Sequence, residues 1–121
     1  MPLFIEVPSI IKADGNKTKI IEEYVGMVNT QTNDISIARM KSPQGWLEPG
    51  QTPEFEEFTL IIRGNLKITT KDGDKNLKEG QAVLIRAGEW VQYSSPDPEG
   101  AEYISVCLPA FSPGTVHRDN N

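Results

Sequence analysis

The fold of this chain is decided by residues 45–64, which read GWLEPGQTPEFEEFTLIIRG. The stretch begins and ends with glycine, and its first half carries the turn signal Pro49-Gly50. Its second half, from Phe58 to Arg63, is rich in the apolar and β-branched residues typical of strands. The expected local structure is therefore a turn that leads into a half-buried strand.

Side chains on a strand alternate between its two faces, so this strand should have two distinct sides. One face should carry Glu57, Thr59 and Ile61, and the opposite face Phe58, Leu60 and Ile62. We expect residues 58–70 to form a hairpin that turns at Gly64-Asn65, followed by a second turn over residues 71–74.

Short strand-like runs separated by turn residues fill the rest of the chain. Beyond the hairpin, we expect strands over residues 19–28, 35–40, 82–85, 90–94 and 103–108. Many short strands with Gly- and Pro-rich turns between them indicate an all-β protein, an antiparallel sandwich or barrel. At 121 residues the chain has the size of one domain.

The composition excludes several classes of function. A formal net charge of −5 disfavours binding to nucleic acid, because an acidic surface repels phosphates. No apolar run approaches the length of a membrane span, and the first residues do not resemble a secretory signal. The single cysteine, Cys107, cannot form an internal disulfide, which is consistent with the cytoplasmic location that we expect.

The spacing within residues 45–64 resembles the first signature motif of the cupin superfamily. That motif reads Gly, five residues, His-x-His, three or four residues, Glu, six residues and Gly. Here Gly45, Glu57 and Gly64 match, whereas Gln51 and Pro53 fill the two histidine positions.

A second stretch resembles the second cupin motif, which reads Gly, five residues, Pro-x-Gly, two residues, His, three residues and Asn. Gly80 and Gly88 match, whereas Arg86, Val91 and Ser95 fill the Pro, His and Asn positions. Two matching frames in the right order make the resemblance specific, and it covers residues 35–110. Among cupins, the chain looks like small single-domain proteins, with ethanolamine-utilisation-type cupins as more distant relatives.

The resemblance implies a single-domain jelly-roll barrel, the double-stranded β-helix, over residues 35–110. Residues 1–34 would form an N-terminal segment with a candidate interface strand at 19–28, and residues 111–121 a C-terminal tail. Cupins of this size are often homodimers that exchange N-terminal strands, so a homodimer is the expected assembly.

Typical cupins hold one divalent metal in the barrel with three histidines and the glutamate. The corresponding positions here are Gln51, Pro53, Glu57 and Val91, of which Pro53 and Val91 offer no ligand atom. We therefore predict no metal or other cofactor. The alternative is a divalent metal held by a rearranged set of side chains: Gln51, Glu57, Cys107 and His117.

The candidate ligand contacts are Gln51, Glu57, Tyr93 and Arg39. A carboxylate such as Glu57 that enters an apolar barrel needs a hydrogen-bond partner, or it solvates a wet barrel mouth. Tyr93 shares its strand face with Val91, so its hydroxyl should point the same way. Arg39 either pairs with Glu57 inside the barrel or lies on the surface.

The resulting hypothesis is a small-molecule-binding protein with its pocket in the barrel lumen, whether or not it is an enzyme. One alternative is a metal-dependent isomerase, dioxygenase or decarboxylase with non-standard ligands. Another is a structural or regulatory protein whose barrel is filled by its own side chains.

Overall fold

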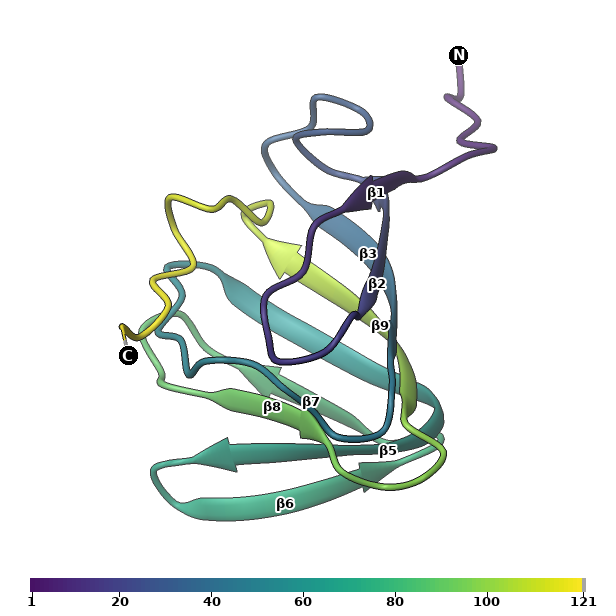
Figure 1. The fold of residues 1–121 in the computed structure, drawn as a ribbon. Helices are drawn as coiled ribbons and strands as arrows, with labels where there is room; N and C mark the ends of the chain where they lie inside the picture. Colours follow the sequence, from purple (N-terminus) through teal and green to yellow (C-terminus); the bar gives the residue numbers. More distant parts are fainter. Residues whose placement is uncertain (121) are drawn as a thin grey trace.

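A computed structural model describes residues 1–120 of the chain, which form nine strands and no helix (Figure 1). In chain order the strands are β1 (Ser9–Ile11), β2 (Ile20–Val25), β3 (Ser36–Ser42), β4 (Trp46–Leu47), β5 (Glu56–Thr70), β6 (Gly73–Lys78), β7 (Ala82–Ile85), β8 (Gln92–Ser95) and β9 (Ala101–Leu108). The all-β prediction is confirmed. Within these residues no helix is present that could cross a membrane.

All strand pairs are antiparallel, and β5 belongs to two sheets. Its first half pairs with β7 and β9, and β9 continues through β3 and β2 to β1. Its second half pairs with β6 and β8, and β8 pairs with β4. The two sheets curl toward each other around a common interior, as Figure 1 shows, which confirms the jelly-roll prediction.

The predicted hairpin over residues 58–70 is wrong, because β5 runs through Gly64 without turning. A bulge between Ile61 and Arg63 takes the place of the turn. Asn65 to Thr70 then pair with β6, so the chain reverses later, at Lys71 and Asp72. Gly64 has φ +78°, and a Cβ atom there would lie 2.2 Å from the carbonyl oxygen of Gly100. The glycine therefore permits a close approach of β5 to the start of β9.

The predicted alternation along β5 is confirmed. Thr59 and Ile61 are 2% and 1% exposed and Glu57 is also buried, whereas Phe58 and Leu60 are 38% and 44% exposed. After the bulge the inward side chains switch from odd to even positions, because one extra residue exchanges the two faces of a strand.

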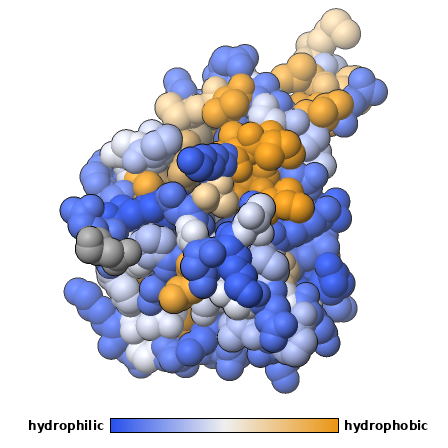
Figure 2. Space-filling view, in the orientation of Figure 1, coloured by the Kyte–Doolittle hydropathy of each residue, from blue (hydrophilic) through white to orange (hydrophobic). Residues whose placement is uncertain are grey.

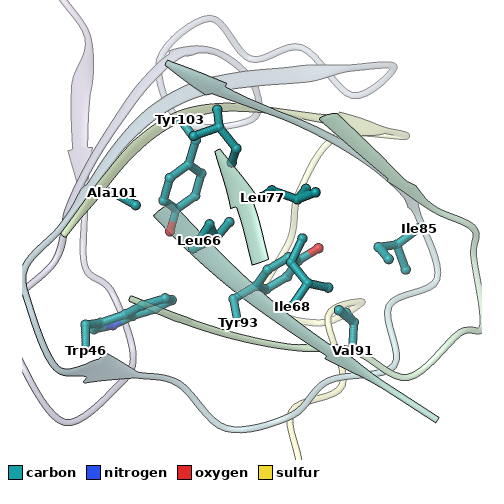
Figure 3. Packing of buried hydrophobic residues seen from close by; sticks show 10 residues of the cluster. Trp46, Leu66, Ile68, Leu77, Ile85, Val91, Tyr93, Ala101 and Tyr103 are labelled. Atoms are coloured by element: carbon teal, nitrogen blue, oxygen red, sulfur yellow. The ribbon is translucent and has the colours of Figure 1, made fainter. Parts of the chain in front are cut away.

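The interior between the two sheets holds the main apolar core. Figure 3 shows side chains from β4, β5, β6, β8 and β9 that converge there. The buried members of this core are Trp46, Ile61, Leu66, Ile68, Leu77, Ile85, Val91, Tyr93, Ala101 and Tyr103. A second, smaller cluster joins Phe55, Cys107 and Val116, with Phe111 packed against it. The core anchors the walls of the cavity described below.

The N-terminal strand over residues 19–28 is present as β2, but it is not an edge strand. It pairs with β1 on one side and β3 on the other, so the free edge belongs to β1. Residues 1–8 extend away from the body in Figure 1, and apolar surface gathers in the same part of Figure 2. Exposed Leu3, Phe4 and Val7 contribute to this apolar segment.

The C-terminal segment from residue 109 to residue 120 lies along residues 50–54. The amides of Thr52 and Glu54 donate to the carbonyls of His117 and Thr115, and the amide of Asp119 donates to the carbonyl of Gly50. These bonds hold the segment across one end of the barrel. The predicted tail ends with Asn121, which lies outside the described residues.

Candidate functional site

A cavity of about 70 Å³ lies inside the barrel, among the inward faces of β2, β3, β5, β8 and β9. The segment that leads from β1 to β2 forms another part of its wall, through residues 11–14 and Lys19. Apolar side chains of Ile21, Met40 and Phe111 line it together with several ionisable groups. A cavity with both kinds of lining is typical of small-molecule sites.

Glu57 is the central acidic group of this cavity. The hydroxyl of Tyr93 donates to Oε1 of Glu57 at 2.7 Å, and the hydroxyl of Ser105 donates to Oε2 at 2.7 Å. The thiol of Cys107 lies 3.8 Å from Oε2. The register explains this arrangement, because β5 and β9 place Glu57 opposite Cys107 and Thr59 opposite Ser105. The buried carboxylate is therefore held by donors from two neighbouring strands.

Burial keeps the two weak acids beside Glu57 protonated. Desolvation raises the pKa of Tyr93 well above its usual value, and the negative charge of Glu57 raises it further. The pKa of the Cys107 thiol is also raised, first by burial and then by Glu57. Both groups therefore act as hydrogen-bond donors at neutral pH, and Cys107 is not an activated thiolate.

A second polar group lies in the same cavity, around Arg118. Its Nη1 atom donates to Oε2 of Glu48 and to Oε1 of Gln51, each at 2.8 Å. Its Nε atom forms an ion pair with Asp14 at 2.6 Å. Burial raises the pKa of Glu48, while Lys19 and then Arg118 act in the opposite direction. This network connects the C-terminal segment, residues 48–51 and the segment between β1 and β2.

The residues at the cupin ligand positions do not fit a metal. Val91 is fully buried without a donor atom, and Pro53 offers none. Oε1 of Gln51 accepts from the guanidinium of Arg118, a positive group that would repel a cation at that place. Among residues 1–120, no three His, Cys, Asp or Glu side chains are grouped closely enough to hold a metal ion.

The structure brings three of the four predicted ligand contacts to the cavity: Gln51, Glu57 and Tyr93. Arg39 lies elsewhere, where its guanidinium pairs with Glu102 at 2.7 Å and its side chain is 41% exposed. Strand alternation accounts for this, because the inward neighbours on β3 are Ala38 and Met40. The geometry therefore gives no support to Arg39 as a ligand contact.

The alternative metal set is not assembled either. Gln51, Glu57 and Cys107 line the cavity, but the exposed imidazole of His117 pairs with Glu54 at the surface. The backbone of the C-terminal segment explains the difference, because it directs Arg118 inward and His117 outward.

Sequence reasoning missed several polar cavity residues, among them Lys19, Glu48, Ser105 and Arg118. Strand alternation offers a signal for Ser105, since it shares the parity of Cys107 on β9. Lys19 likewise shares the parity of Ile21 on the strand expected at residues 19–28. Glu48 and Arg118 carry no such signal, because they lie outside regular strands.

The fold resembles several solved structures. RemF, a polyketide cyclase from Streptomyces resistomycificus, matches with a TM-score of 0.76 at 13% identity, over 100% of this chain and 87% of that chain. Oxalate decarboxylase from Bacillus subtilis matches with a TM-score of 0.75 at 16% identity, over 94% of this chain and 30% of that one. The EutQ protein of Clostridium difficile matches with a TM-score of 0.64 at 20% identity, over 77% of this chain and 64% of that one. These likenesses show the cupin fold.

A relative with higher sequence identity is endoribonuclease YbeY from Myxococcus xanthus (strain DK1622). It is 39% identical over 101 residues, which make up 84% of this chain. The match spans 34% of the length of that relative.

A family match covers residues 41–119, and its description is an AraC-like ligand-binding domain. This range includes β4 to β9 and the C-terminal segment with Arg118. It therefore contains six of the nine strands and most of the ionisable side chains that line the cavity. From this match and from its cupin fold, we conclude that the chain belongs to the AraC-like ligand-binding domain family.

Proposed function

We propose that this chain binds a small molecule in the barrel cavity and does so without a metal ion. The proposal rests on the position and hydrogen bonds of Glu57. Its carboxylate faces a cavity, and the hydroxyls of Tyr93 and Ser105 fix its two oxygens. A buried polar group with a fixed orientation can recognise one arrangement of donor groups on a ligand. Membership of a ligand-binding family is consistent with this role.

The role assigned to each residue follows from its position. Glu57 would accept a hydrogen bond from the ligand, and Tyr93 would orient Glu57. Gln51 and Arg118 would close the polar end of the cavity. Ile21, Met40 and Phe111 would contact the apolar part of the ligand.

A thermal-shift screen against small metabolites tests the proposal, because a ligand that binds the folded state raises the melting temperature. Ala38→Leu adds bulk to the cavity wall, and Ala87→Leu is a matched control in the exposed turn after β7. We expect compounds that stabilise the wild type and Ala87→Leu but fail to stabilise Ala38→Leu. A screen without such compounds would favour a structural or regulatory protein.

Elemental analysis separates this proposal from a metal-dependent enzyme. We expect purified protein to carry no stoichiometric transition metal. About one tightly bound metal per chain that disappears in Glu57→Ala would contradict the metal-free proposal and support a metal-dependent isomerase, dioxygenase or decarboxylase.

We also propose that the chain forms a homodimer through the outer face of the sheet made by β5, β7 and β9. Five large apolar side chains of this face are 37% to 44% exposed: Phe58, Leu60, Ile62, Leu84 and Leu108. The strand register joins them, because Phe58 lies opposite Leu84 on β7 and opposite Val106 on β9. An apolar sheet face of this kind is typical of a contact between protein subunits, and a second copy offers a matching apolar face.

A further inference from the structure

Lys19 is a buried cation that faces the cavity. The residue is 9% exposed, although lysine is almost never buried without a charged partner. Its ammonium group lies 4.1 Å from the ring centroid of Trp46 and 5.1 Å from that of Tyr103. Figure 3 shows both rings pointing into the interior of the barrel. The aromatic faces hold the ammonium in place, but they do not neutralise its charge.

No carboxylate of residues 1–120 forms an ion pair with this ammonium within 4.0 Å. Lys19 nevertheless lowers the pKa of Glu48, against the larger opposite effect of burial. Lys19 therefore acts on Glu48 electrostatically, from beyond ion-pair distance. The Oε2 atom of Glu48 accepts a hydrogen bond from Arg118 at 2.8 Å. A buried ammonium without a close counter-ion is costly.

The other charged groups that line the cavity wall deep in the barrel have their partners within the chain. Glu57 accepts from Tyr93 and Ser105, as described above. Glu23 accepts from the backbone amides of Val28 and Asn29 at 3.0 Å and 2.9 Å. Arg118 is shared by Glu48, Gln51 and Asp14. Among the described residues, the ammonium of Lys19 is thus a buried cation of the cavity wall that forms no ion pair.

We propose that the ligand carries a carboxylate group that pairs with the ammonium of Lys19. This inference rests on the proposed small-molecule function and names the chemical class of the ligand. The negative group would give this buried ammonium a counter-ion, in a cavity where low polarity strengthens the attraction.

The surroundings of Lys19 set the size and character of the rest of the ligand. Lys19 directly precedes β2, and Ile21 on β2 lines the same cavity and pairs across the sheet with Met40. These two side chains therefore offer apolar contact beside the ammonium. A cavity of about 70 Å³ has room for a few heavy atoms. The ligand class is accordingly a short monocarboxylate with a small apolar body and a hydroxyl group that donates to Glu57.

Lys19 lies outside residues 41–119, the range that matches the ligand-binding family. The carboxylate contact is therefore supplied by the N-terminal segment and not by the matched barrel. It is a specificity-determining feature that the family match alone does not assign.

Calorimetric titration tests the proposal with lactate, 2-hydroxybutyrate and 3-hydroxybutyrate, each compared with its primary amide. The amides keep the shape of the acids and lack the charge. We expect the acids to bind the wild type more tightly than the amides. Lys19→Met, which keeps much of the side-chain length without the charge, should weaken the binding of the acids about tenfold or more. It should leave binding of the amides unchanged.

Lys12→Met is the matched control, because Lys12 also borders the cavity but is exposed. It should retain the affinity of the wild type for the acids. Urea unfolding without ligand gives a second readout. Lys19→Met should be at least as stable as the wild type, because it removes an unpaired buried charge.

The outcomes separate the two proposals. Equal binding of acids and amides, or of acids to wild type and Lys19→Met, would overturn the carboxylate inference and leave the small-molecule function standing. Lys19-dependent binding of inorganic phosphate without binding of the acids would also overturn it. If neither these acids nor any compound of the wider screen binds, both proposals fail.

Discussion

Tyr93 and Glu57 form a buried hydrogen bond of 2.7 Å that joins the two sheets of the barrel. Glu57 lies on the half of β5 that pairs with β7 and β9, whereas Tyr93 lies on β8, which pairs with the other half. The bond therefore crosses the interior and fixes the orientation of the cavity carboxylate.

Tyr93→Phe removes this donor and leaves one oxygen of a buried carboxylate with one partner fewer. The expected cost in the free energy of unfolding is about 1.5–3 kcal/mol, the range for hydrogen bonds to charged groups. Urea unfolding measures it. Tyr24→Phe serves as the control, because the Tyr24 hydroxyl is half-buried on β2 and outside the cavity. Equal stability of the two variants would show that the Tyr93–Glu57 hydrogen bond adds nothing to the free energy of unfolding.

Glu48 should make the wild type less stable as the pH rises. Its pKa in the folded state lies above the usual value of 4.5, because burial disfavours the charged form. A carboxyl group of this kind supports folding while it is protonated, and this contribution is lost as the pH rises through the folded pKa. The free energy of unfolding of the wild type, relative to Glu48→Gln, should therefore fall as the pH rises above the usual value of 4.5 and through the raised folded pKa.

Arg118→Met should enlarge that pH dependence, since it removes one of the cations that lower the pKa of Glu48. Urea unfolding at a series of pH values measures the slope for all three proteins. Parallel curves for the wild type and Glu48→Gln would contradict the prediction, because they would mean that Glu48 has the same pKa in the folded and unfolded states.

Gly64→Ala should cost more stability than Gly80→Ala. The two glycines have nearly the same φ, +78° and +81°, so both alanines suffer the same backbone strain, about 1–2 kcal/mol. The new Cβ atom at position 64 would also lie 2.2 Å from the carbonyl oxygen of Gly100, whereas at position 80 nothing lies within 4 Å. Thermal unfolding of both variants gives the comparison. If Gly64→Ala lowers the unfolding temperature no more than Gly80→Ala does, β9 is able to move away from the new Cβ atom.

Cys107 should react with a thiol reagent only after the barrel opens. It is 4% exposed, and burial raises the pKa of its thiol, so little reactive thiolate forms in the folded protein. Labelling with DTNB should be slow in buffer and fast in urea. Ala87→Cys adds an exposed thiol in the turn after β7 as an internal standard, which should react at once. Fast labelling of native wild-type protein would contradict the burial of Cys107.

The proposed homodimer predicts a mass in solution of twice the 13.4 kDa of one chain, measured by light scattering after gel filtration. Leu60→Asp places a charge in the centre of the apolar outer face and should give a monomer. Lys75→Asp, on the exposed strand β6, should leave the dimer intact. A monomeric wild type would refute the proposal.

The fold could be predicted from the sequence where strand-forming residues and motif spacing indicated the same structure. Alternation along residues 57–62 identified both faces of β5, and two spaced motifs identified the barrel. The hairpin at Gly64 could not be excluded, because a glycine with positive φ is compatible with a turn or with a bulge. Whether Gly64 forms a turn or a bulge depends on its contact with Gly100, which directly precedes β9 and lies 36 positions further along the chain.

The candidate site was predicted less completely, for a similar reason. Gln51, Glu57 and Tyr93 could be named because they stand on or beside the motif strands. Arg118 and Lys19 enter the cavity from segments outside those strands, and their contacts with Glu48 and Trp46 depend on how the chain ends cross the barrel. Alternation with Ile21 indicates the inward direction of Lys19, but nothing in the neighbouring sequence indicates its contact with Trp46 or the inward position of Arg118.

The unbroken course of β5 through both sheets limits how a ligand can enter. Because β5 is part of both sheets, the two sheets cannot separate without breaking the backbone hydrogen bonds between β5 and its partner strands. The segment from residue 12 to residue 18 is different, because it borders the cavity and belongs to no strand. Residues 48–51 and the C-terminal segment also border the cavity outside the strands. A ligand path that leaves the sheets intact therefore lies between these segments, two of which are joined by the Asp14–Arg118 ion pair.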